Sequence, residues 1–211
     1  MRIPFGRVVA TITASAILSL ASTARAEVLF TSLSAWQTAI GSWSETTNFG
    51  VADLTDITAF TTVDGVSIAA AGNVRSVGNG WSTWCCGYTG QVLWSGGPTV
   101  MNFTLASGVK GFGLFAEPER FTVQNITLTT STGASVTQAV NGQGGAAFFG
   151  WVGPGVTSFQ VNSATDFAVG DVFSATGAIP EPATWALMLF GFGGAGALLR
   201  RRRQIGIRMI S

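Results

Sequence analysis

The stretch 99-TVMNFTLASGVKGFGLFAE-117 contains two runs of alternating apolar residues, separated by the turn-forming pair Ser107-Gly108. Alternation of this kind predicts β-strands with one buried face. The expected buried positions are Met101, Phe103 and Leu105 in the first strand, with Phe112 and Leu114 in the second. A chain that repeats this unit should build its core from sheets, so the stretch favours an all-β fold.

Similar units occupy most of residues 27–179, which is enough chain for one domain with a sizeable core. In 60-FTTVDGVSIAA-70, the pair Asp64-Gly65 is a strong hairpin signal, and Thr132-Gly133 separates two further β-prone runs. Further strands are expected at 121–130, 135–140, 146–153, 158–163 and 167–175. We therefore predict a single jelly-roll-like β-sandwich ectodomain over residues 27–177.

One short helix is expected near the start of this body, at 32-SLSAWQTAIG-41. Ser32 or Ser34 can cap its N-terminus, and Gly41 can end it. Leu33, Trp36 and Ile40 recur at helical spacing and should form its buried face.

The body is acidic although the whole chain has a formal net charge of +1. Within residues 27–179 there are three basic and nine acidic residues, which gives a net charge of −6. Nucleic-acid binding needs a basic patch that neutralises phosphates, so the body is not expected to bind nucleic acid. An acidic surface is compatible with a polysaccharide matrix.

Histidine is absent from the chain, which excludes Ser-His-Asp and Cys-His catalytic arrangements. Carboxylate pairs of the glycosidase kind remain. Glu117 and Glu119 would share a strand face, but Pro118 lies between them and Arg120 follows. We interpret this segment as a solvated turn and do not expect the body to be an enzyme.

Cys85 and Cys86 are adjacent. Neighbouring Cα atoms lie about 3.8 Å apart, below the usual disulfide range of about 4.4–6.8 Å. A bond between the two would be strained and comparatively easy to reduce. Three states remain open: a vicinal disulfide that stiffens a loop, which we favour, intermolecular disulfides, and two reduced thiols.

Four aromatic residues surround the cysteines, and their flat faces suit stacking on sugar rings: Trp81, Trp84, Tyr88 and Trp94. The competing interpretation is that they cap one end of the sandwich, since tryptophan buries a large area. A calcium site is a further candidate, with Asp166 and Asp171 supplying oxygen ligands beside loop carbonyls. No other cofactor is expected.

Residues 1–26 have the order of a secretory signal peptide. Arg2 and Arg7 form a basic start, 8–20 is an uncharged and largely apolar run, and Ala24-Arg25-Ala26 is a small–x–small cleavage pattern. The mature chain is therefore expected to begin at Glu27, after signal peptidase has acted.

Residues 183–199 carry no charge, and as a helix they would extend about 25 Å, near the short limit for crossing a bilayer. Trp185 lies near one boundary, where an indole is favoured. The other boundary carries a basic cluster that should stay in the cytoplasm and stop translocation: Arg200, Arg201, Arg202 and Arg203. This pattern predicts a transmembrane helix with the body outside the inner membrane.

Pro180-Glu181-Pro182, the apolar run and the arginine cluster together resemble the PEP-CTERM sorting signal, over residues 178–203. This tail is also named the ice-binding protein C-terminal domain. The resemblance implies handling by an exosortase, a membrane-embedded cysteine transpeptidase-like enzyme of Gram-negative bacteria, which recognises the Pro-Glu-Pro triplet and removes the tail. Members usually end soon after the arginines, whereas residues 204–211 here add a short cytoplasmic extension.

The body is also similar to ectodomains that precede such signals. The segments 108-GVKGFG-113 and 167-FAVGD-171 correspond to their recurring strands, and this resemblance implies a jelly roll without assigning chemistry.

The expected function is therefore that of an exported cell-surface or extracellular-matrix protein, with a structural or adhesive role in exopolysaccharide or biofilm. A membrane-tethered carbohydrate-binding module is the alternative, and a small polysaccharide-active enzyme is a third.

Overall fold

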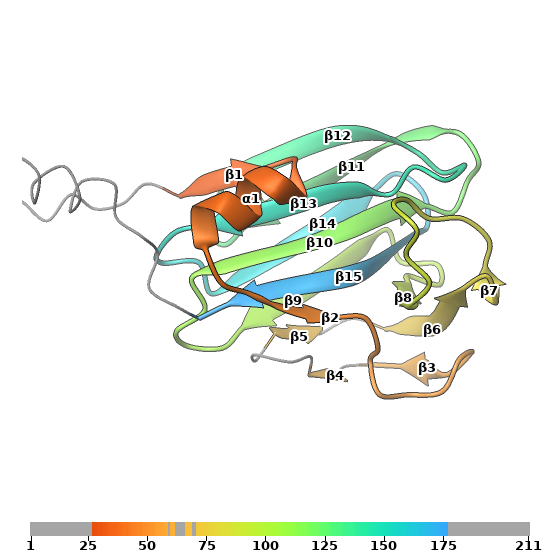
Figure 1. The fold of residues 1–211 in the computed structure, drawn as a ribbon. Helices are drawn as coiled ribbons and strands as arrows, with labels where there is room; N and C mark the ends of the chain where they lie inside the picture. The colour runs from red at the N-terminus through yellow and green to blue at the C-terminus, as the bar shows by residue number, and fades with distance from the viewer. Residues whose placement is uncertain (1–26, 59, 62–65, 69–70, 177–211) are drawn as a thin grey trace, which may run out of the picture.

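Two open β-sheets, which we call sheet A and sheet B, lie face to face and form a sandwich (Figure 1). The computed structural model describes residues 27–58, 60–61, 66–68 and 71–176. Sheet A consists of β1 (Val28–Phe30), β2 (Ser44–Thr46), β3 (Asp56–Ile57), β6 (Gly72–Val77), β7 (Gly80–Trp81), β8 (Gln91–Trp94), β10 (Gly111–Pro118), β13 (Ala147–Val152) and β15 (Phe167–Ala175). Sheet B consists of β4 (Phe60–Thr61), β5 (Val66–Ile68), β9 (Val100–Leu105), β11 (Val123–Thr130), β12 (Ser135–Asn141) and β14 (Ser158–Ser163).

The strand prediction is confirmed for the principal elements. β4 and β5 pair as the expected hairpin, and β11 and β12 form the second one. β9 and β10 are adjacent in the sequence but lie in different sheets, and from β12 to β15 the chain passes between the sheets at each connection. The coarse prediction of a mostly β body is confirmed, while its jelly-roll assignment stays a prediction.

The main core lies between the two sheets. β9 contributes Met101, Phe103 and Leu105, as their alternation predicts, and β10 contributes Phe112 and Leu114. Phe103 stacks on Phe159 of β14 with ring centroids 4.5 Å apart. This contact joins β9 and β14 of sheet B, and Phe112 of sheet A packs against both rings.

The outer face of sheet A is covered at one end by α1 (Leu33–Ile40). Of the two cap candidates, Ser32 caps the helix, and Gly41 ends it as predicted. Trp36 is fully buried, and its Nε1–H donates to the backbone carbonyl of Trp151 on β13 at 3.0 Å. This bond fixes the helix to the sheet.

The other end of that face is covered by the segment 81–90, which packs its aromatic side chains on β8 and β15. The central strands of sheet A are therefore buried on both faces, and every residue of β10 is buried. Sheet B keeps the simple alternation of a sheet that faces solvent on one side, as in β14 and β9.

A β-bulge interrupts β15 at Asp171. Gly113 of β10 pairs with Phe173, but Phe115 pairs with Gly170, so two residues of β15 oppose one residue of β10. Asp171 has φ +51°, the left-handed conformation found at bulges. Without the extra residue, the alternation that buries Phe167 and Val169 would direct Asp171 into the core. The bulge places Val172 there instead.

The two ends of the described body lie in one row across sheet A. Val28 pairs with Val152, Val152 pairs with Gly111, and Gly111 pairs with Ala175. Figure 1 shows both ends at the same end of the sandwich, while β7 lies at the opposite end.

The predicted Asp64-Gly65 turn lies outside the described residues, and so do five longer predicted segments, which the structure does not test. They are the signal peptide 1–26, the transmembrane helix 183–199, the triplet Pro180, Glu181 and Pro182, the basic cluster Arg200, Arg201, Arg202 and Arg203, and the extension 204–211. Within the part of the chain that the structure describes, no helix has the length and apolar character to cross a membrane.

Candidate functional site

The four aromatic residues singled out from the sequence gather at the end of sheet A covered by segment 81–90. Trp81 packs with Val92 and Ala168, and the remaining three aromatics border this cluster: Trp84, Tyr88 and Trp94. Trp84 and Tyr88 lie 5.9 Å apart between ring centroids. The cluster therefore covers the sheet, and of the four residues only Trp81 also lines the pocket described below.

Glu117 anchors this covering segment. It projects from the outer face of β10 and is 0% exposed, so the interpretation of this residue as part of a solvated turn was wrong. Its Oε2 accepts from Trp81 Nε1–H at 3.1 Å, and its Oε1 accepts from the Thr83 hydroxyl at 3.0 Å. The backbone N–H groups of Gly144 and Gly145 also donate to Oε1. These four bonds tie segment 81–90 to the turn between β12 and β13.

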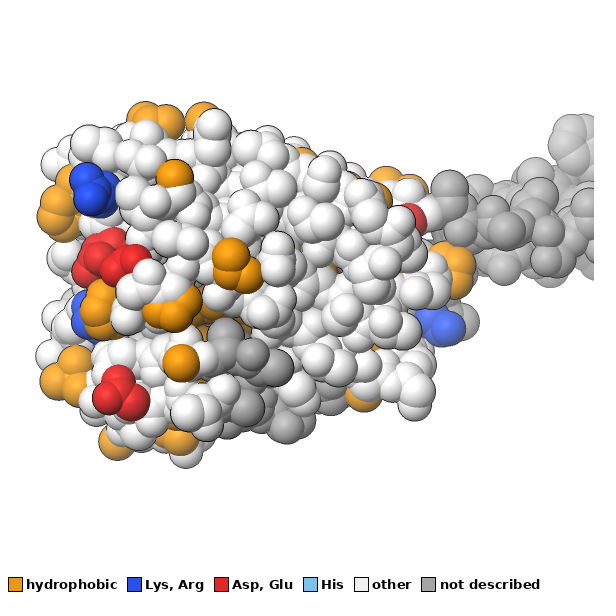
Figure 2. All heavy atoms as spheres, turned by 180° about the vertical axis from the view of Figure 1, so that it is seen from behind, with side chains coloured by type: hydrophobic (Ala, Val, Ile, Leu, Met, Phe, Trp, Pro, Cys, Tyr) orange, Lys and Arg blue, Asp and Glu red, His pale blue; other side chains and the backbone are white. Residues whose placement is uncertain are grey.

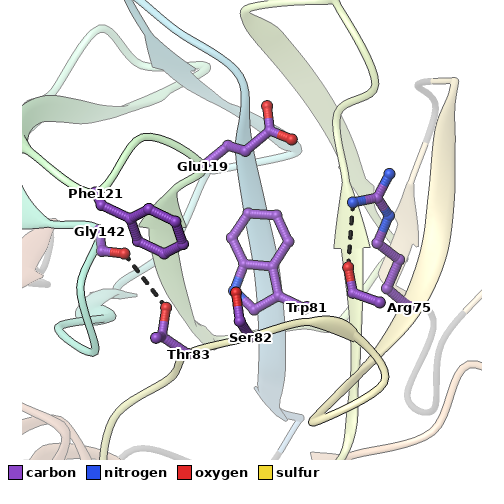
Figure 3. A pocket seen from close by; sticks show the side chains of 8 residues that line it. Arg75, Trp81, Ser82, Thr83, Glu119, Phe121 and Gly142 are labelled. Atoms are coloured by element: carbon purple, nitrogen blue, oxygen red, sulfur yellow. Dashed lines mark hydrogen bonds between the residues drawn. The ribbon is translucent and has the colours of Figure 1, made fainter.

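A pocket of about 180 Å³ lies beside this anchor (Figure 3). In Figure 3 the Trp81 ring stands between the side chains of Phe121 and Arg75, and Glu119 lies above it. The Thr83 hydroxyl also lies 3.3 Å from the carbonyl oxygen of Gly142, which accepts from it. The full lining is Arg75, Gly80, Trp81, Ser82, Thr83, Glu119, Phe121 and Gly142.

The wall formed by Arg75 is held by several contacts. The guanidinium carbon lies 3.7 Å from the Trp94 ring centroid, a cation–π arrangement. Nη1 donates to the carbonyl of Gly80 at 3.2 Å, and Nε donates to Asn73 Oδ1 at 3.1 Å. A guanidinium has five N–H donors, so donors remain for a ligand after these two bonds.

The opposite wall is open and apolar. Phe121 is 59% exposed, although phenylalanine is usually buried. Glu119 is exposed beside it. The pocket therefore combines an exposed aromatic ring with a cation, a carboxylate and hydroxyl groups, a mixture that suits a small polar ring compound with apolar faces.

Asp171 lies apart from this pocket, on the side of the bulge that faces β2. Its backbone N–H donates to the Tyr88 hydroxyl at 3.3 Å, and that hydroxyl donates to the carbonyl of Gln91 at 2.7 Å. Burial, together with the neighbouring carboxyl of Glu45, raises the pKa of Asp171 to about 7.

Asp166, the other residue of the calcium hypothesis, lies five residues earlier, before the start of β15, so about 16 Å of extended chain separates the two. The structure thus brings Asp171 to Glu45. Among the described residues no group of three or more Asp, Glu, Cys or His side chains converges as a metal site. The calcium hypothesis stays a prediction.

The Asp171–Glu45 pair should make stability depend on pH. The reference pKa of Asp171 is 3.8 and the folded value is about 7, so within this window the folded state holds a proton that the unfolded chain has released. Stability should therefore fall as pH rises from 4 to 8, on the order of 1 to 2 kcal/mol since the carboxyl is partly exposed to solvent. Asn tolerates a positive φ, and Asp171→Asn should remove most of this slope.

Urea unfolding at pH 5 and pH 8 measures this effect, with Asp166→Asn as the matched control that keeps the wild-type slope. An Asp171→Asn variant whose stability falls with pH as steeply as that of the wild type would refute the assignment.

Cys85 and Cys86 are free thiols in the structure, with sulfur atoms 2.7 Å apart. Cys86 is exposed and has φ +64°, whereas Cys85 is partly buried. Burial and the neighbouring Cys86 thiol raise the pKa of Cys85 to about 12, so Cys85 is a weak nucleophile at neutral pH. The vicinal disulfide stays a prediction.

Sequence reasoning missed Arg75 and Phe121 as pocket residues and Glu45 as the neighbour of Asp171. No local pattern marks them: Arg75 lies on β6, Glu45 lies on β2, and Phe121 lies in the connection between β10 and β11. Phe121 precedes β11 as the first residue of an alternating run and reads as one more strand residue.

Comparisons with known proteins give one clear result, which concerns residues 178–203, outside the described part of the chain. No curated protein matches the chain. Among solved structures, the enzymatically active domain of tailspike protein 4 from bacteriophage CBA120 is similar at 16% identity over 64% of this chain. The alignment spans 19% of the tailspike chain with a TM-score of 0.24, which is too low to support any inference.

Residues 178–203 match the protein family described as the PEP-CTERM protein-sorting motif. The match covers the triplet Pro180–Pro182, the apolar run and the whole arginine cluster, including Arg201 and Arg202 at its centre. The chain therefore carries a PEP-CTERM sorting motif, the signal of an exported protein that is sorted by an exosortase.

Proposed function

We propose that this exported protein has a structural or adhesive role in extracellular polysaccharide, and that the pocket lined by Trp81 and Phe121 holds a sugar residue. The observation that carries the proposal is the composition of this pocket. The C–H face of a sugar ring packs on an aromatic ring, while its hydroxyl groups need polar partners. Phe121 supplies the exposed ring, and Arg75, Thr83 and Glu119 supply the polar groups.

A non-enzymatic role fits this pocket better than glycoside hydrolysis. Hydrolysis requires two carboxyl groups that flank the bond and reach the substrate. Glu119 lines the pocket, but Glu117 is 0% exposed and four donors already occupy its oxygens. Within the part of the chain described, Glu117 therefore acts as an anchor for Trp81.

The location proposed for the mature protein is the cell surface or the extracellular matrix, with the inner membrane as an intermediate location. Its partners would be signal peptidase and an exosortase during maturation, then extracellular polysaccharide. A module that stays tethered to the membrane is the second candidate.

The pocket is tested with Phe121→Ala, since an exposed ring can be removed with little effect on folding. The exported protein is applied to immobilised exopolysaccharide from its own source. Loss of the ring should weaken binding about tenfold, which corresponds to about 1.4 kcal/mol. The matched control is Trp43→Ala, which removes another exposed aromatic ring, 40% exposed and outside the pocket lining. Equal retention of the two variants and the wild type would reject the pocket.

A further inference from the structure

The outer face of sheet B lacks charge. None of its six strands, over the residues that the structure assigns to them, contains Asp, Glu, Lys or Arg. Solvent-facing sheets normally carry charged side chains, which keep them soluble and protect their edges. Figure 2 views the molecule from the side of sheet B. The charged side chains visible there lie toward the two ends, and the surface between them is mainly white apart from scattered hydrophobic groups and the grey residues.

The side chains that replace charge on this face are hydroxyls and amides. We define the uncharged face by its central outward residues: Asn102, Thr104, Thr127, Thr129, Thr137, Ser158, Gln160 and Asn162. They alternate with core residues along each strand, so their outward direction follows from the burial pattern. Because they come from four neighbouring strands, they form one continuous surface.

Strand register arranges these groups in rows. Ser135, Thr129, Gln160 and Asn102 pair successively across the four strands, and Thr137, Thr127 and Asn162 form a parallel row. Strands lie about 4.8 Å apart, and residues on the same face repeat about every 6.8 Å along a strand. The face therefore presents hydrogen-bonding groups on a grid with the scale of linked sugar rings.

These groups retain bonding capacity after their bonds to one another. Gln160 donates to Asn102 Oδ1 at 3.1 Å, and the Thr127 and Thr137 hydroxyls lie 2.7 Å apart. A hydroxyl offers one donor and two lone pairs, and an amide offers two donors and two lone pairs. One internal bond leaves each pair able both to donate and to accept, as sugar hydroxyls require.

A groove crosses the uncharged face at the level where β11 ends and β14 begins. It encloses about 430 Å³ between β9, β14 and β11. Its polar lining comprises Asn102, Thr104, Thr129, Thr130, Ser131, Ser158 and Gln160, with Phe103 and Phe159 beneath. The groove is larger than the Trp81 pocket, and it is lined by uncharged side chains alone.

We propose that the uncharged face binds an extended chain of a neutral polysaccharide, at a site separate from the pocket. The lack of charge on this face and the negative charge of the body favour a neutral polymer over an anionic one. The face offers no cation to an anionic polymer, and the body's net charge of −6 repels one. A neutral polymer carries only hydroxyl and ether groups, which this surface matches without burying an unpaired charge.

The test is native electrophoresis of the exported protein through gels that contain a neutral polymer: a galactomannan, dextran or the neutral fraction of the host exopolysaccharide. Gels with alginate, an anionic polymer, and gels without polymer run alongside. The double variant Thr104→Glu/Gln160→Glu places two negative charges in the groove. The control Ala35→Glu/Thr38→Glu adds the same charge on exposed positions of α1, on the other sheet.

We expect at least one neutral polymer, and not alginate, to retard the wild type and the control variant. The groove variant should bind at least tenfold more weakly. The proposal is overturned if the groove variant is retarded like the control, if alginate retards the wild type equally, or if no neutral polymer retards the wild type. Sedimentation velocity without polymer covers self-association: a dimer that only the groove variant dissociates would assign the face to a second copy of the chain.

Phe121→Ala separates this inference from the proposed pocket. Retardation of that variant at the wild-type level, with its retention on the immobilised matrix reduced, would establish two independent sites.

Discussion

Replacing Glu117 by alanine should lower the free energy of unfolding by about 3 to 5 kcal/mol, the largest stability effect expected from one polar residue in this protein. The variant removes the acceptor of three donors, Trp81 Nε1–H and two backbone N–H groups, and leaves the Thr83 hydroxyl only the Gly142 carbonyl. Each buried donor left unsatisfied costs about 1 to 3 kcal/mol. Rearrangement of segment 81–90 should recover part of that cost.

Glu117→Gln refines this test. A glutamine can keep its carbonyl oxygen toward the three donors that Glu117 Oε1 serves, but its NH₂ group then faces Trp81 Nε1–H, and both groups are donors. We expect a smaller loss of about 1 to 2 kcal/mol. Urea unfolding measures both variants, and Glu119→Gln is the matched control because Glu119 is exposed. A Glu117→Ala variant within about 1 kcal/mol of that control would show that the anchor is dispensable.

Replacing Pro180-Glu181-Pro182 by three alanines should abolish removal of the tail, an all-or-none change in the mature protein. The PEP-CTERM motif spans residues 178–203, and the triplet is the part that the resemblance assigns to recognition by the exosortase. The intact mass of the wild type should correspond to a chain that begins at Glu27 and ends within or next to the triplet. The variant should retain Arg200–Arg203 and fractionate with the inner membrane.

Gln204→Ala is the control for this experiment, because it changes a residue outside the matched motif. It should be processed like the wild type. A triple-alanine variant with the same mature mass as the wild type would reject recognition at the triplet. A wild type that keeps the arginines would favour a permanently tethered module.

The strands could be predicted from the sequence where one face is buried and the other faces solvent. β9 and β14 belong to sheet B, where outward polar residues such as Asn102 and Gln160 alternate with buried ones, so burial and alternation agree there. α1 could be predicted equally well, because its N-cap Ser32, its buried Trp36 and its terminating Gly41 lie in one short stretch of chain. Local sequence patterns were enough to predict those elements whose residues either face solvent or contact near neighbours in the chain.

Sheet A shows why the rest could not be predicted. In the sequence, Glu117 stands at the end of an apolar run and precedes Pro118, which suggests a surface turn, yet distant segments around Trp81 and Gly144 close over it. The bulge at Asp171 depends on a register shift against β10, and no sequence pattern near Asp171 indicates that shift. In both cases the environment of a carboxyl group is created by chain far away in the sequence.

The candidate site follows the same rule. Trp81 was singled out because its flat ring suits stacking on a sugar, but its neighbours in the pocket include residues from β6 and from the connection between β10 and β11. The remaining three aromatics cover the sheet. The aromatic residues indicated the end of the sandwich at which the pocket lies, but the sequence did not indicate which other residues line it.

The row that joins Val28, Val152, Gly111 and Ala175 has a consequence for how the protein would be displayed. The two ends of the described body lie within three strand spacings, about 14 Å, on the side away from the pocket. An attachment made through the residues after Ala175 would therefore project the Trp81 pocket outward by roughly the 30 Å length of β15. The body would act as a spacer as well as a binder, and cutting the attachment would leave the pocket and the uncharged face unchanged.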